Sequence, residues 1–141
     1  MNKTLLIILG NQLFNPRFLK TIRFNFIFMA EDYELCSYVK HHKLKILMFL
    51  LSMREYCDEL REKNYNVIYK SLEDKSFKEK YENKLETIIT KKNINKIIFF
   101  EIEDKFFEAR INRFAKKRNI AIEIITSPMF LFKRNDFKIF A

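Results

Sequence analysis

The chain has 141 residues, of which 48% are hydrophobic and 32% charged, and its formal net charge is +9. These values describe one globular domain with a real core and exclude a disordered chain. One Gly and two Pro are too few for an all-β fold built on tight turns. No apolar run approaches the roughly 20 residues of a membrane span, and no signal peptide is recognisable.

Strand and helix patterns alternate along the chain. The predicted strands are Lys3–Leu9, Asn25–Ala30, Asn66–Tyr69, Lys96–Phe100 and Ala121–Ile125. A turn or two of helix around Arg17–Arg23, begun by Pro16, precedes longer helices at about Tyr33 to Lys63, Phe77–Lys92 and Lys105–Arg118. This alternation predicts an α/β, three-layer domain with a five-stranded parallel sheet in the order 3-2-1-4-5.

Apolar residues at helical spacing mark the sides of the helices that are expected to face the core. In the long helix these residues are Leu47, Leu50, Met53, Cys57 and Leu60. In the next helix they are Tyr81, Leu85, Ile88 and Ile89, and in the last helix Phe107, Ile111, Phe114 and Ala115. The three helices are therefore predicted to pack on the sheet along these stripes.

The loop after the first strand is the leading candidate site. The apolar run Leu5–Leu9 stops at Gly10-Asn11-Gln12-Leu13, which holds the single glycine of the chain. Ligands of open α/β sheets bind beyond the carboxyl ends of the strands, where the strand order reverses, and the first strand usually flanks that point. A glycine there permits a tight turn or the close approach of a ligand. The alternative is an ordinary strand-to-helix turn.

Glu31 is the second candidate, because it closes the second strand 21 residues after Gly10. In doubly wound folds an acid at this place often binds ribose hydroxyls, which suits a ligand with a polyol chain. The alternative is a carboxylate favoured by the dipole at a helix start, a role that Asp32 or Glu34 fills equally well.

The sequence gives less support to a dinucleotide site, a phosphate-binding loop or a magnesium site. Gln12 and Asn15 break the GxGxxG pattern of a dinucleotide site, and the chain has no GxxxxGK[ST] loop. Glu101, Glu103 and Asp104 follow the fourth strand and could bind Mg²⁺ together with substrate phosphates. Without a phosphate loop, helix capping by Asp104 among surface glutamates is the preferred interpretation. No catalytic residue and no metal ligand is assigned.

The charge and the cysteines bear on partners and compartment. A net charge of +9 suits nucleic acid, an acidic membrane surface or an anionic ligand. The lysines are spread over several segments, which favours a compositional bias and leaves weak, non-specific DNA contact as the expectation. Cys36 and Cys57 belong to no CxxC or Cys/His cluster, so a zinc site is not expected. Two free thiols fit a reducing cytoplasm.

Four segments together resemble one protein family. They are Leu9–Leu13, Phe28–Glu31, His42–Arg54 with its H-K-x-K…M-R pattern, and Ser127–Leu131. In this order and spacing they are similar to the amino-terminal domain of the deoxyribodipyrimidine photolyase-related proteins, the bacterial iron–sulfur cryptochromes and (6-4) photolyases. The resemblance covers nearly the whole chain and only the first domain of the family.

The resemblance implies a Rossmann-like domain that holds an antenna chromophore, 6,7-dimethyl-8-ribityllumazine. By analogy Gly10, Asn11, Gln12, Leu13 and Glu31 line its pocket. The family commonly has Asp where this chain has Asn11, and an amide still bonds to ribityl hydroxyls.

The same resemblance divides the chain at its end. Residues 1–126 are expected to form the α/β domain, and residues 127–141 a Phe-rich tail leading toward a helical domain that binds flavin and DNA. In the family that helical domain holds FAD and a cysteine-ligated iron–sulfur cluster, so neither is expected in this chain. The chain is expected to be truncated and inactive by itself. The alternative, suggested by the apolar tail, is an interaction module that pairs with a separate flavin-bearing chain.

Overall fold

Five parallel strands form the centre of the fold. They are β1 (Lys3–Ile7), β2 (Phe26–Ala30), β3 (Val67–Lys70), β4 (Ile94–Phe100) and β5 (Ala121–Ile125). The computed structural model describes residues 2–32 and 43–128, and its sheet has the order β3-β2-β1-β4-β5 with every pair parallel. The predicted fold class and strand order are confirmed. The chain reverses its direction of travel across the sheet between β1 and β4, so the switch point lies there.

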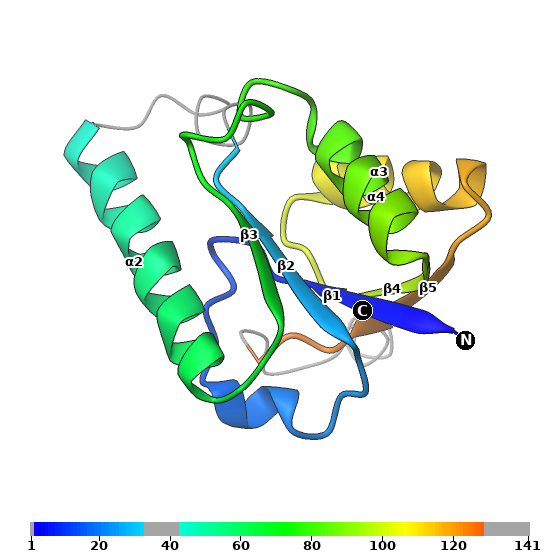
Figure 1. Ribbon diagram of the computed structural model, residues 1–141, viewed down its shortest axis with the longest axis horizontal. Coiled ribbons are helices and arrows are strands. Elements are labelled where there is room, and N and C mark those ends of the chain that lie inside the picture. The colour runs from blue at the N-terminus through cyan, green and yellow to red at the C-terminus, as the bar shows by residue number, and fades with distance from the viewer. Residues whose placement is uncertain (1, 33–42, 129–141) are drawn as a thin grey trace, which may run out of the picture.

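Helices cover both faces of this sheet (Figure 1). On one face lie the 3-10 helix η1 (Pro16–Leu19) and α2 (Lys43–Glu62), and on the other lie α3 (Tyr81–Lys92) and α4 (Lys105–Lys117). Each face has its own apolar core because the strand side chains alternate between them. No helix in the described part of the chain is long and apolar enough to cross a membrane.

Asparagine ends each of the three α-helices found among residues 43–128. Asn64, Asn93 and Asn119 have φ values of 69°, 56° and 57°, in the left-handed region, and each follows the last turn of a helix. Helices commonly end on a residue in this conformation, and asparagine is the usual substitute for glycine there. A chain with a single glycine therefore stops its helices with asparagine.

Two expectations about the helices need correction. Leu47 was expected to face the core, but its side chain is 52% exposed, whereas Leu50, Met53, Cys57 and Leu60 are buried. Leu47 lies about 60° around the helix from Leu50, which is far enough to turn it off the sheet.

The helix expected from Phe77 begins at Tyr81 instead. Asp74 accepts a hydrogen bond from the backbone N–H of Ser76 at 2.9 Å and holds the preceding stretch in turns. The part of the long helix expected over residues 33–42 lies outside the described residues.

Candidate functional site

An open hollow of about 400 Å³ lies beside the loop that follows β1. The loop contributes Gly10, Asn11, Leu13 and Phe14, and the first half of α2 contributes the remaining lining residues, Lys45, Met48, Phe49 and Ser52. Its walls are mostly apolar and aromatic, with a few polar groups among them. This composition and volume are typical of small-molecule sites.

Gly10 lies directly against two side chains of α2. A Cβ atom at this position would overlap the ring of Phe49 and approach the sulfur of Met53 to 2.9 Å. The glycine therefore lets α2 pack directly against the end of β1. Because Phe49 also lines the hollow, this close approach shapes the candidate site.

Gln12 points away from the hollow, into the sheet. Its side-chain nitrogen donates to the carbonyl of Glu101 at 3.1 Å and more weakly to that of Phe100 at 3.5 Å. Its side-chain oxygen lies 3.4 Å from the N–H of Leu9, which donates to it. The buried amide thus joins the ends of β1 and β4 at the switch point. Direct contact of Gln12 with a ligand stays a prediction.

Glu31 is buried in a network of hydrogen bonds at the end of β2. Arg54 of α2 donates two bonds to its carboxylate, at 2.8 and 2.9 Å, and the hydroxyl of Tyr69 on β3 donates one at 2.7 Å. The backbone N–H of Leu72 adds a fourth at 3.2 Å. Burial alone would raise the pKa of Glu31, but these bonds and the charge of Arg54 outweigh it and lower the pKa. Direct contact of Glu31 with a ligand also stays a prediction.

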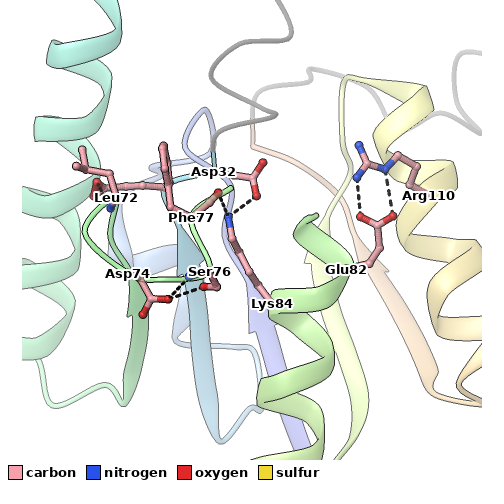
Figure 2. Close-up of polar contacts among 9 residues, drawn as sticks. Asp32, Leu72, Asp74, Ser76, Phe77, Glu82, Lys84 and Arg110 are labelled. Atoms are coloured by element: carbon pink, nitrogen blue, oxygen red, sulfur yellow. Dashed lines mark hydrogen bonds and ion pairs between the residues drawn. The ribbon is translucent and has the colours of Figure 1, made fainter. Parts of the chain in front are cut away.

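The next residue, Asp32, forms a buried ion pair that the sequence did not reveal. Its carboxylate lies 2.6 Å from the ammonium of Lys84, and both side chains are fully buried. Figure 2 shows that the ammonium group also donates to the carbonyl of Phe77, at 2.9 Å. The spacing indicated only that Lys84 faces inward, because it follows Tyr81 by three residues and precedes Leu85 on the inward stripe of α3.

A second ion pair links the two helices on this face. Arg110 of α4 donates to Glu82 of α3 at 2.6 and 3.3 Å (Figure 2). Burial alone would raise the pKa of Glu82, but the hydrogen bond from Arg110 outweighs it and lowers the pKa. The pair fixes the spacing of the two helices.

A smaller hollow of about 310 Å³ lies beside the edge strand β3 and was not predicted from the sequence. Its lining residues are Arg54, Cys57, Asp58, Arg61, Tyr69, Ser71 and Glu73. Burial raises the pKa of the Cys57 thiol, which keeps it protonated and a weak nucleophile. Arg54, one of these lining residues, also binds Glu31 through its guanidinium.

Three carboxylates follow β4, and one of them, Asp104, binds backbone N–H groups. Asp104 accepts hydrogen bonds from the N–H groups of Phe106 and Phe107, at 2.9 and 3.2 Å, so its predicted capping role is confirmed. Glu103 is exposed as expected, but Glu101 is buried. Residues 2–32 and 43–128 contain no group of three or more His, Cys, Asp or Glu side chains placed to hold a metal ion.

Comparison with known proteins leads to the same family as the sequence motifs. Residues 6–141 match the family described as deoxyribodipyrimidine photo-lyase-related protein. A curated relative, the (6-4) photolyase of Agrobacterium fabrum, is 26% identical over 112 residues, which span 79% of this chain and 22% of the relative. The chain thus covers less than a quarter of that protein. Since the family match extends over almost the whole sequence, the chain belongs to the deoxyribodipyrimidine photo-lyase-related protein family.

Proposed function

We propose that this chain is the antenna-chromophore-binding domain of a photolyase-related protein and carries no repair activity by itself. The observation that supports this most directly is the hollow beside Gly10 and Asn11. It opens beyond the carboxyl end of β1, next to the switch point, where doubly wound domains bind their ligands.

The lining of the hollow fits a ribityllumazine, which combines a flat bicyclic ring with a polyol chain. Phe14, Phe49 and Met48 offer apolar and aromatic surface to the ring, while Asn11 and Ser52 offer hydrogen bonds to hydroxyls. Bound there, the chromophore would supply light absorption. In this proposal Gln12 and Glu31 set the shape of the loop and of α2 around the site.

Titration of the purified chain with 6,7-dimethyl-8-ribityllumazine tests the proposal, with absorption and fluorescence as readouts. We expect saturable binding by the wild type. Ser52→Trp, which fills the hollow, is expected to abolish binding, while Leu51→Trp adds the same indole to the adjacent exposed position and preserves it. A folded wild type that ignores the chromophore, or equal loss in both variants, rejects the assignment.

The outward face of α2 supports a second candidate function, an interaction module that pairs with a separate flavin-bearing chain. Leu44, Leu47, Met48 and Leu51 repeat at intervals of three and four residues, and each is more than half exposed. Such a stripe is the pattern by which a helix binds an apolar groove. Its position on the side of α2 away from the sheet leaves it uncovered among the described residues.

Purification of the tagged chain from its native host tests this second function. Co-purification of a stoichiometric second chain together with a flavin absorption spectrum is expected. The double variant Leu47→Gln/Leu51→Gln should lose both, while Leu72→Gln, an exposed leucine outside α2, should retain them. A colourless, monomeric wild type argues against pairing.

A further inference from the structure

Every strand of the sheet begins beside a basic residue and an asparagine. These pairs are Asn2 and Lys3 at β1, Arg23 and Asn25 at β2, Lys63 and Asn64 at β3, Lys92 and Asn93 at β4, and Arg118 and Asn119 at β5. Because all five strands are parallel, their amino ends lie along one edge of the sheet. The described stretches 2–3, 20–25, 63–66, 91–96 and 116–120 make up this edge, here called the amino edge.

Charge is distributed very unevenly between the two edges. The amino edge holds ten basic side chains and no Asp or Glu: Lys3, Lys20, Arg23, Lys63, Lys91, Lys92, Lys96, Lys116, Lys117 and Arg118. The described stretches that follow the strands at the opposite edge mix acids with a smaller number of lysines: Glu31, Asp32, Glu73, Asp74, Glu79, Glu101, Glu103 and Asp104 with Lys75, Lys78 and Lys80. The amino edge therefore differs from the opposite edge in having basic residues with no Asp or Glu among them.

Helix dipoles account for only part of this pattern. Cations in the last turn of a helix are favoured by its dipole, which explains Lys91 and Lys117. Lys3 and Arg23 end no helix. The ammonium groups of Lys3 and Lys92 lie 5.9 and 5.4 Å from the centre of one ring, that of Phe26. Two cations from different elements thus contact one aromatic ring near the middle of the edge.

Some members of the edge are paired, and others face solvent. Arg118 binds Glu86 at 3.0 Å and Lys96 binds Glu123 at 3.0 Å. Lys63, Lys91 and Lys117 are exposed, as are the three asparagines that end the helices. The exposed members combine positive charge with amide donors, the groups that bind phosphate oxygens.

We propose that the amino edge binds the phosphate backbone of nucleic acid. With strands about 4.8 Å apart, five strands give a ledge about 19 Å wide, which matches roughly five or six phosphates of one duplex strand. An anionic membrane would also attract this charge, but surface-bound proteins add apolar side chains that insert among the lipids. The exposed large hydrophobic residues of the described chain lie outside the five stretches of this edge.

The proposal is independent of the chromophore site, which lies at the opposite end of β1. The test is binding of a fluorescein-labelled DNA duplex of 20 base pairs between 50 and 200 mM salt. The amino-edge variant Lys63→Gln/Lys91→Gln/Lys117→Gln removes three exposed charges. The control Lys75→Gln/Lys80→Gln/Lys105→Gln removes three exposed charges from the opposite edge. Both triple variants have the same net charge.

The wild type and the control are expected to bind alike, and the amino-edge variant more weakly with a shallower salt dependence. Loss of three phosphate contacts makes the slope of log binding constant against log salt concentration shallower by about 2.7. Between 50 and 200 mM salt, the affinity of the wild type should therefore fall about 40-fold more than that of the variant. Circular dichroism and thermal melting establish that both variants fold.

Three results would overturn the proposal. The first is that the wild type fails to bind DNA at 50 mM salt. The second is that the two triple variants lose affinity equally, which assigns the effect to net charge alone. In the third, phosphatidylserine vesicles bind the edge and DNA does not, which assigns it to a membrane.

Discussion

Two adjacent acids at the end of β2 meet two different cations. Glu31 binds Arg54 of α2 on one face of the sheet, and Asp32 binds Lys84 of α3 on the other. The alternation of side chains along a strand separates them. Each residue therefore connects a different helix to the same strand, beside the loop that forms the candidate site.

The Glu31 network makes stability depend on pH. Glu31→Gln keeps the shape of the side chain and removes its charge, so at pH 7 we expect a loss of about 2 kcal/mol in unfolding free energy. The folded pKa of Glu31 is lowered. Its contribution is therefore present above the unfolded pKa, about 4.3, and disappears as pH falls through the folded value. In urea unfolding from pH 7 to 3, the difference in unfolding free energy between the wild type and Glu31→Gln should decrease as the pH falls.

Glu73 provides the matched control for that experiment. It contacts the same Arg54, at 3.3 Å, from an exposed position. Because exposed ion pairs contribute little, Glu73→Gln should leave stability almost unchanged. Equal effects of the two substitutions would show that burial does not distinguish the two glutamates.

Gly10 contributes both to the packing of α2 and to the candidate site. Gly10→Ala forces Phe49 to move, and we expect a loss of about 1–3 kcal/mol together with weaker chromophore binding. Asn11→Ala, one residue along the same loop at an exposed position, should leave stability almost unchanged. Thermal melting measures the first effect. An unchanged melting temperature in Gly10→Ala would mean that Phe49 moves without cost.

At the scale of elements, the ends of the helices are specified by local side chains. Asp104 begins α4 by binding two backbone N–H groups, and asparagines end α2, α3 and α4. The middle of α2 is governed by tertiary contacts, since it has one apolar stripe on the sheet and another exposed to solvent. Periodicity alone does not distinguish these two stripes.

The capping role of Asp104 predicts a moderate effect. Asp104→Ala leaves two N–H groups at the start of α4 without their side-chain partner, which should cost about 1 kcal/mol. Glu103→Ala removes a neighbouring exposed carboxylate that has no capping bond and should be close to neutral. Chemical denaturation of the two variants checks this, and equal losses would contradict the capping role.

At the scale of the whole molecule, one buried ion pair joins the sheet to α3. Lys84 and Asp32 come from segments 52 positions apart and have no access to solvent. The pair lies on the opposite face from α2 and its network. Together the two ion-pair systems attach both helical layers to β2.

Removing one partner of this pair should be severe. Lys84→Met leaves the Asp32 carboxylate buried without its cation, and we expect a loss of about 3–5 kcal/mol. The double variant Asp32→Leu/Lys84→Met should recover much of that loss, because no charge stays buried. Lys80→Met, at an exposed position one turn earlier, serves as the control. A double variant no more stable than Lys84→Met would contradict the electrostatic explanation.

The fold class, the strand order and the cap of α4 could all be predicted from the amino-acid sequence. These follow from local patterns: apolar runs, helical periodicity and an acid ahead of a helix, each of which acts over a few residues. The same is true of the Gly10–Leu13 loop, whose place after the first strand already marked it as a candidate site.

Which side chains meet became evident from the folded arrangement of the chain. The partners of Glu31 and Asp32 lie between 23 and 52 residues away, and no spacing rule identifies them. Eight lysines from five separate stretches of the sequence come together at the amino edge because these stretches adjoin the starts of five parallel strands. Local energies specify strands and helices, whereas contacts between distant residues and the resulting electrostatic field depend on how the sheet brings those segments together.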